Sequence, residues 1–309
     1  MERHRVVVAG FTSRVAQLIT ASLLEHEGIE ITGICRDKTK VPSLVSQNPN
    51  VTVVEAEYND KARLGGALQG ASVCVCCYFG PEDLMLHGQM ILIDSCIAEN
   101  VPRYIASDFS FDYRGLKHGD FPFKDSQLEI HDYLARRERQ GRITAVHVLN
   151  GGFFEAVLFP FMGALDVTAR KIRYWGTGDE PWDMTSMQDT ARFAAKVILD
   201  QQATGVLNVR GARKSLREIA GVLEHVYGSK FTLENLGTIQ DLHEKMSSAR
   251  EAFPDDVGQW LGLHYNYFTI NGSTLLRGYD NDRYPDVRVQ SLETFCRQHS
   301  LEQLPTLFR

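Results

Sequence analysis

Short apolar runs alternate with amphipathic stretches over the first half of the chain. The apolar runs predict six strands, at 5–9, 31–36, 51–55, 71–78, 102–106 and 143–149. Apolar residues at helical spacing predict helices between them, at 15–24, 60–68, 83–100 and 126–140. The run 71–78 is almost wholly apolar, as in a parallel strand buried on both faces. Strands that alternate with helices in this way predict a doubly wound parallel α/β sheet of the Rossmann-like kind.

The second half of the chain is less regular. Strands are expected at 171–175, 205–209 and 230–235, and helices at 186–199, 215–227 and 242–253. An aromatic tail follows, which contains Trp260, Tyr265, Tyr267 and Phe268. We therefore expect a sheet domain over 1–153 and a smaller C-terminal α+β lobe over 154–309, partly interleaved with the sheet.

The first predicted strand runs directly into a turn and a helix. In dinucleotide-binding folds three glycines stand in such a turn, where a pyrophosphate meets the helix N-terminus. Their places fall at Gly10, Ser13 and Ala16, so only the first glycine is kept. Ala16 is still small enough for helix–strand packing, and Ser13 and Arg14 can both donate to phosphate oxygens. We expect a dinucleotide here; the alternative is an empty turn with Ser13 as an ordinary N-cap.

The end of the second predicted strand indicates which dinucleotide would bind. NAD-selective folds place an acidic residue there, on the ribose 2′-hydroxyl. This strand ends in Arg36, whose guanidinium can stack on adenine and pair with a 2′-phosphate. Lys38 or Lys40 would add charge, and Asp37 weakens the case if it turns inward. The pattern favours NADP(H); the alternative is a solvated surface arginine.

The carboxyl ends of the predicted strands define a candidate site that does not depend on the glycine turn. In doubly wound sheets the ligand lies along these ends. The candidate cofactor contacts are Gly10, Thr12, Ser13, Arg14, Val15, Arg36, Lys40, Tyr78, Phe79, Ser107, Asp108, Phe109, Asn150, Gly152 and Phe153. On this reading residues 1–153 form the NADP-binding domain and 154–309 the substrate lobe.

The composition of the chain limits the kinds of binding partner that we expect. The 309 residues carry a formal net charge of −6, which argues against a nucleic-acid partner. No apolar run reaches the length of a membrane span, and no signal-peptide core precedes the first strand. We therefore expect a cytoplasmic protein, monomeric or homodimeric, with a small-molecule substrate.

The cysteines predict core packing and no metal. Cys74, Cys76 and Cys77 stand in one predicted strand, where they are expected as small buried residues. A Cys-x-Cys-Cys spacing on a strand does not suit zinc, whose ligands come in pairs across a turn. A reduced, cytosolic protein is the natural interpretation.

Several short stretches together resemble one family. They are 8–13 at the start, Arg36, the run 101–109, Phe123-Lys124-Asp125 before a charged helix, Asn150-Gly151-Gly152-Phe153, and 284–287. The chain resembles the atypical short-chain dehydrogenases of the isoflavone reductase-like and NmrA-like family over nearly its whole length. The Tyr-x-x-x-Lys pair of ordinary short-chain dehydrogenases is absent, because Asp120 stands four residues before Lys124. Gly-x-Ser-x-Gly is absent too, which argues against a hydrolase.

The resemblance implies a catalytic role for Lys124. In the family a lysine just before the charged helix contacts the nicotinamide ribose and serves in catalysis, and Lys124 matches it. Burial and nearby positive charge would lower its pKa, so that it could act as a general acid. Tyr113 is the nearest tyrosine that could assist, and the segment from Asn150 to Phe153 matches the family's segment beside the nicotinamide. The alternative for Lys124 is a surface lysine at a helix start, and the alternative for Phe153 is simple core packing.

The expected function is an NADPH-dependent reductase of a small aromatic or polyketide-like natural-product intermediate. Two alternatives stay open: a non-redox isomerase or rearrangement enzyme of secondary metabolism, and an NADP-sensing regulatory protein of the same family. The stretch 175–182 either lines a flat apolar substrate pocket or forms a loop with packing aromatics. His131 is expected as a partly exposed helix residue rather than a base.

Overall fold

The computed structural model describes residues 4–308 and contains a large parallel sheet. Its strands are β1 (His4–Ala9), β2 (Ile29–Cys35), β3 (Val51–Glu55), β4 (Val73–Cys76), β5 (Arg103–Ile105), β6 (Thr144–Leu149) and β11 (Gly205–Asn208). They lie in the order β11-β6-β5-β4-β1-β2-β3, and every pair is parallel. The predicted doubly wound sheet is confirmed. Because the winding reverses between β1 and β4, a crevice is expected at their carboxyl ends.

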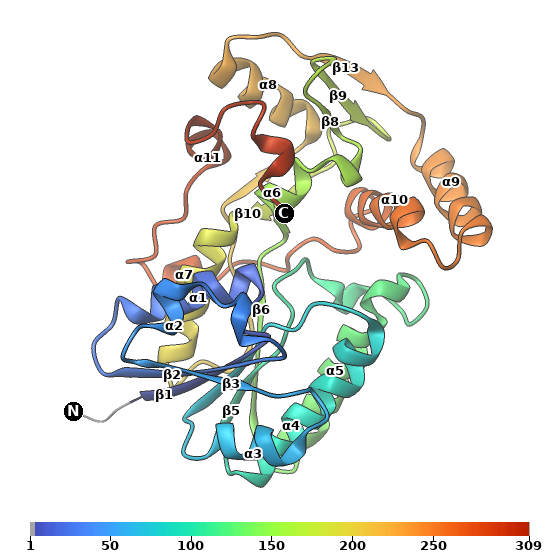
Figure 1. Cartoon of the computed structure of the whole chain (residues 1–309). Coiled ribbons are helices and arrows are strands. Elements are labelled where there is room, and N and C mark those ends of the chain that lie inside the picture. The colour runs from blue at the N-terminus through green and yellow to red at the C-terminus, as the bar shows by residue number, and fades with distance from the viewer. Residues whose placement is uncertain (1–3, 309) are drawn as a thin grey trace.

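Helices cover both faces of this sheet (Figure 1). One face carries α3 (Lys61–Leu68), α4 (Gln89–Ala98), which continues a π-helical turn at Leu84–Gly88, and α5 (Pro122–Arg139). The other carries α1 (Arg14–Leu24) and α7 (Met187–Leu199), which pack against each other. The short helix α2 (Ser43–Ser46) precedes β3. Both faces of each central strand are therefore buried, which explains the continuous apolar runs in the sequence.

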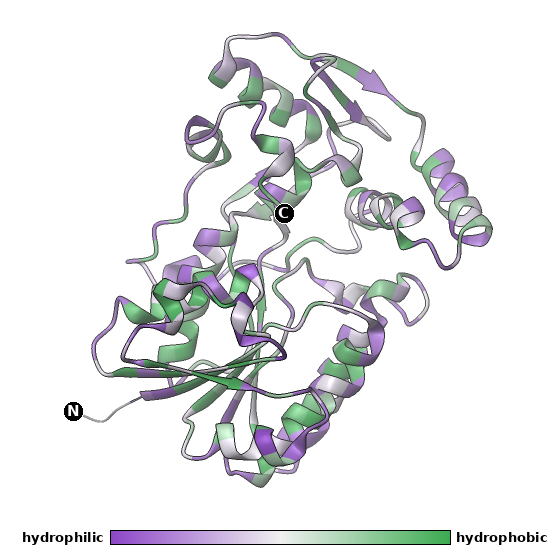
Figure 2. Cartoon of the chain, viewed as in Figure 1, coloured by the Kyte–Doolittle hydropathy of each residue, from purple (hydrophilic) through white to green (hydrophobic). Residues whose placement is uncertain are grey.

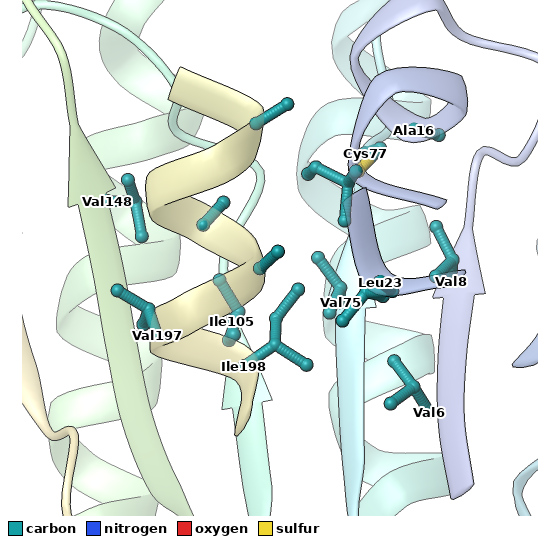
Figure 3. Close-up of a cluster of buried hydrophobic side chains, with 14 of the residues drawn as sticks. Val6, Val8, Ala16, Leu23, Val75, Cys77, Ile105, Val148, Val197 and Ile198 are labelled. Atoms are coloured by element: carbon teal, nitrogen blue, oxygen red, sulfur yellow. The ribbon is translucent and has the colours of Figure 1, made fainter. Parts of the chain in front are cut away.

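The core between the sheet and helices α1 and α7 is built from small and β-branched side chains. Figure 3 shows strand residues such as Val8 and Val75 facing Leu23 of α1 and Ile198 of α7. In Figure 2 much of the large sheet is green, whereas α5 and α9 alternate between green and purple. The predicted core packing of these cysteines is confirmed: Cys74, Cys76 and Cys77 are free and buried, and burial raises the pKa of each thiol.

A smaller α+β lobe sits over the carboxyl ends of the large sheet (Figure 1). One of its three-stranded sheets comprises β7 (Gly152–Phe153), β10 (Trp182–Thr185) and β12 (Ala212–Lys214). The other comprises β8 (Leu165–Asp166), β9 (Lys171–Tyr174) and β13 (Thr232–Asn235). Its helices are α6 (Phe154–Val157), α8 (Leu216–Tyr227), α9 (Ile239–Ala252), α10 (Val257–Ile270) and α11 (Leu292–Arg297). Between these elements the chain returns to the large sheet to add α7 and β11.

The segment expected as an aromatic tail is a helix. α10 contains Trp260, Tyr265 and Phe268, all aromatic residues of modest helix propensity. Asp256 caps it, since its side chain accepts a hydrogen bond from Gly258 N at 3.2 Å. The helix then packs against α9 and the 3₁₀ turn Pro160–Met162, so tertiary burial outweighs propensity.

Candidate functional site

An apolar cavity of about 700 Å³ lies along the carboxyl ends of the large sheet, below the smaller lobe. Eleven of the residues expected at the site line it. They are Ser13, Arg14, Val15, Tyr78, Phe79, Ser107, Asp108, Phe109, Lys124, Gly152 and Phe153. The loops after β1, β4, β5 and β6 therefore meet where the strand-end argument placed them.

Five expected residues do not line the cavity. Gly10 opens the turn after β1, and Asn150 is fully buried, donating from Nδ2 to Gly151 O at 3.0 Å. Thr12 and Arg36 are exposed. Lys40 is also exposed, 3.8 Å from Asp37.

The turn after β1 places the N-terminus of helix α1 at the cavity. Gly10 has φ +75°, and a Cβ there would lie 2.5 Å from Cys77 O of the neighbouring chain segment. Ser13 caps α1 by accepting from Ala16 N at 3.2 Å, so the N-cap role holds whether or not a ligand binds. The Arg14 guanidinium donates to Leu307 O near the C-terminus. The first-turn N–H groups of α1 have no partner within the helix, which makes this end suited to an anion.

Lys124 is a buried residue of the cavity wall. Only 3% of its surface is exposed, and Nζ donates to Ser110 Oγ at 2.8 Å. Nζ also lies over three aromatic rings, 4.9 Å from the centroid of Phe111, 5.7 Å from Tyr265 and 5.8 Å from Phe123. Burial lowers the pKa of Lys124 to about 8, although the Asp108 carboxylate acts in the opposite direction. A lysine with such a pKa can give and regain a proton near neutral pH.

The sequence placed Lys124 just before a helix that was expected to begin at 126, and this boundary is wrong. α5 begins at Pro122, and Lys124 stands in its first turn. Proline suits the first helical position because it lacks the N–H that would be unpaired there. Lys124 therefore belongs to the helix itself and not to the loop before it.

The carboxylate of Asp108 is held from behind by two buried side chains. Tyr113 OH donates to Oδ1 at 2.9 Å, and His147 Nδ1 lies 2.7 Å from Oδ2. Tyr113 is fully buried and does not line the cavity, so it does not reach a substrate there. His131 lies in α5 with its ring 4.8 Å from that of His147 and is partly exposed, as predicted.

Sequence reasoning missed the far wall of the cavity. This wall comes from the smaller lobe and the C-terminus and includes Phe161, Met162, Trp260, Tyr265 and Phe308. Of the two tryptophans in 175–182, Trp182 lines the cavity and Trp175 packs in the lobe's own core. The aromatic residues of α10 were the one available signal, since aromatic side chains at helical spacing fit a helix that faces a pocket.

Within residues 4–308, no group of three or more His, Cys, Asp or Glu side chains could hold a metal ion. None of the helices described combines the length and hydropathy needed to cross a lipid bilayer.

Solved structures of similar fold cover nearly the whole chain. AtPrR2 with NADP+ and (+)-pinoresinol has 19% identity and a TM-score of 0.80, over 96% of this chain and 99% of that one. Leucoanthocyanidin reductase from Vitis vinifera, in a binary complex with NADPH, has 15% identity and a TM-score of 0.78, over 98% and 99%. An NADPH-dependent quinone oxidoreductase from Escherichia coli, complexed with NADPH, has 19% identity and a TM-score of 0.73, over 98% and 100%. At these identities the likeness establishes the fold.

Sequence comparison identifies the family. A comparison with curated proteins gave no match. The model of the NmrA-like family matches residues 2–281, which include the turn after β1, Lys124 and most of the cavity. With this match and the shared fold, the chain belongs to the NmrA-like family.

Proposed function

We propose that the protein is an NADPH-dependent reductase of a small aromatic or polyketide-like molecule. The observation that carries the proposal is a buried lysine with a pKa near neutrality, placed in an apolar cavity that opens onto the N-terminus of α1. Structures of this fold that hold NADP+ or NADPH support the choice of cofactor.

The residues present fit the cofactor. The N-terminus of α1 would hold the pyrophosphate, with Arg14 exchanging Leu307 O for a phosphate oxygen. Arg36 follows β2 and is exposed, and no hydrogen bond or ion pair within 4–308 fixes it. Asp37 does not compete with a 2′-phosphate from inside the site, because its carboxylate accepts from Thr39 N at 3.0 Å. When bound there, NADPH supplies the hydride.

Lys124 would protonate the oxygen that becomes negative during reduction. Ser110 fixes Nζ through its hydroxyl, and the surrounding rings exclude water while still tolerating a cation. The apolar walls favour a flat, uncharged substrate, and Phe161 and Tyr265, which line the cavity, would supply aromatic contacts to it.

Calorimetric titration tests the cofactor. We expect NADPH to bind about 10- to 100-fold more tightly than NADH, and Arg36→Ser to remove that preference, since a charge-assisted contact contributes about 1.5–3 kcal/mol. The matched control is Arg139→Ser, an exposed arginine at the far end of α5. No binding of either nucleotide would contradict the proposal and favour the non-redox isomerase. Binding without turnover on any substrate would favour the regulatory protein.

The pH dependence tests the proton donor. A general acid must carry its proton, so kcat/KM should be flat below pH 8 and fall tenfold per pH unit well above it. A profile measured with saturating NADPH checks this. A rate that rises through pH 8 would assign Lys124 to the role of base.

A further inference from the structure

The ammonium group of Lys124 has one polar neighbour. Nζ donates to Ser110 Oγ at 2.8 Å, and it makes no second hydrogen bond and no ion pair within the described part of the chain. Its other near neighbours are the rings of Phe111, Tyr265 and Phe123. Lys124 is 3% exposed and Ser110 is 9% exposed, and both line the cavity. Ser110 therefore offers a larger share of its surface to a ligand in the cavity than Lys124 does.

The hydroxyl of Ser110 accepts from Lys124 but donates to no group among residues 4–308. A hydroxyl has one hydrogen to donate and two lone pairs that accept. The nearby Ser107 also lines the cavity, but its hydroxyl already donates to Tyr78 O at 2.7 Å. The hydrogen of the Ser110 hydroxyl is thus available to a ligand.

The backbone fixes the position of Ser110. The residue pairs with Leu149 in a parallel bridge, and its carbonyl accepts from Asn150 N at 2.9 Å. These contacts hold Ser110 beside the carboxyl end of β6 before any ligand arrives. A donor that is held in advance stabilises charge that develops on a ligand without having to reorganise.

Building on the proposed function, we propose that Ser110 is a catalytic residue: its hydroxyl gives the proton to the substrate oxygen, and Lys124 acts through it by replacing that proton. The carbonyl carbon gains the hydride that bound NADPH supplies, so the carbonyl group is reduced and the cofactor is oxidised. The electron pair of the C=O π bond moves to the oxygen, which takes the Ser110 hydrogen as a proton. Oγ takes a proton from Nζ in the same step, which leaves an alcohol and a neutral Lys124 amine. Water returns the proton to Nζ after the product leaves.

This relay keeps the positive charge where the protein accommodates it. The ammonium stays among aromatic rings, whose faces tolerate a cation, and donates to a hydroxyl oxygen. Hydrogen bonds in such a chain strengthen one another, because each donor polarises the next. A serine hydroxyl that an ammonium contacts is therefore a stronger donor to an oxyanion than an isolated serine.

The test uses nitrophenol, a flat aromatic alcohol that absorbs visible light when it is ionised. Its oxyanion stands in for the substrate oxygen, so spectroscopic titration at pH 7 measures affinity without cofactor or turnover. We expect Ser110→Ala to bind the anion about 10- to 100-fold more weakly, because a hydrogen bond to a charged group is lost. Ser110→Thr keeps the hydroxyl and should restore the affinity to within about threefold. Ser95→Ala is the matched control and should change nothing, since it removes a hydroxyl that donates to Ile91 O within α4.

A double-mutant cycle tests whether Lys124 acts through Ser110. Lys124→Met alone should weaken nitrophenolate binding about tenfold, because the Ser110 hydroxyl loses the ammonium that polarises it. In the Ser110→Ala background the same change should cost less than about threefold, since the link to the ligand is already gone. Losses that multiply would show that the ammonium contacts the ligand directly, and they would overturn the relay. Thermal melts show which variants are folded.

The catalytic readout uses the same variants with an aromatic carbonyl compound such as phenanthrenequinone. Ser110→Ala should lower kcat by about 10²-fold and leave NADPH affinity nearly unchanged, as expected for a donor that acts on the reacting oxygen. An unchanged kcat in folded Ser110→Ala would contradict the role of Ser110 in the reaction.

The outcomes separate this inference from the proposed function. Equal or absent nitrophenolate binding in wild type and folded Ser110→Ala overturns the inference, even if the protein is a reductase. Weaker binding in Ser110→Ala with a non-additive cycle, in a protein that reduces no substrate, supports the inference while the proposed function fails. Tyr265→Phe keeps the ring beside Nζ and removes its phenol. A larger loss of affinity in that variant than in Ser110→Ala would give the donor role to the tyrosine and overturn the inference.

Discussion

Replacing Lys124 by Met should lower turnover by about 10²- to 10⁴-fold, the usual contribution of a positioned general acid. Met fills a similar volume among Phe111, Phe123 and Tyr265 but has no proton to give. NADPH affinity should change little, since the pyrophosphate and 2′-phosphate would be held elsewhere, at α1 and Arg36. Steady-state kinetics and calorimetry on the same preparation measure the two effects.

The same variant should be more stable than the wild type. Folding lowers the pKa of Lys124 from 10.5 to about 8, so below pH 8 the folded protein carries a buried ammonium at full cost. That cost declines as pH rises from 8 to 10.5, because the unfolded chain then binds the extra proton. Lys124→Met removes this cost. We expect the free energy of unfolding at pH 7 to rise by about 1–3 kcal/mol, once the loss of the hydrogen bond to Ser110 is subtracted.

Lys61→Met is the matched control for both effects, because Lys61 is exposed at the start of α3. This variant should leave turnover unchanged and the melting temperature nearly unchanged. A Lys124→Met variant that retains full turnover would remove Lys124 from the reaction. One that loses turnover and stability together would point to misfolding instead of lost chemistry.

Most of the large sheet could be predicted from the sequence because its signals are local. Continuous apolar runs such as Val73–Cys76 mark strands that are buried on both faces, whichever neighbours they find. Helix α10 could not be predicted in the same way. Its aromatic residues have modest helix propensity, and they are helical because of packing against α9, a contact that a local pattern does not reveal.

The residues of the candidate site also fall into two groups: those that local sequence signals could indicate and those that only the tertiary fold brings to the cavity. Residues that follow strands, such as Ser107 and Asp108, were placed at the cavity because parallel strands end at one edge. Tyr265 and Phe308 reach the same cavity as Lys124 from distant parts of the chain, so no spacing rule links them. The hydrogen bonds of Asp108 were equally hidden, since His147 stands in a strand that its pattern marks only as apolar.

Gly10→Ala should both destabilise the protein and weaken NADPH binding more than tenfold. Alanine at φ +75° is strained, and its Cβ would lie 2.5 Å from Cys77 O and 3.0 Å from Tyr78 N. These are backbone atoms, so the turn or the segment after β4 must move. We expect a loss of about 3 kcal/mol by chemical denaturation. Both segments border the cavity, so the proposed pyrophosphate site shifts with them.

Gly66→Ala shows what the same change does where nothing obstructs it. Gly66 is exposed within α3, and no atom lies within 4 Å of a Cβ built there. Alanine should stabilise this helix by about 0.5–1 kcal/mol and leave NADPH binding alone. If Gly10→Ala behaved like Gly66→Ala, the close approach of the turn to Cys77 would not be required. The single glycine kept in the turn would then not account for cofactor binding, and the N-terminus of α1 would have to hold the pyrophosphate unaided.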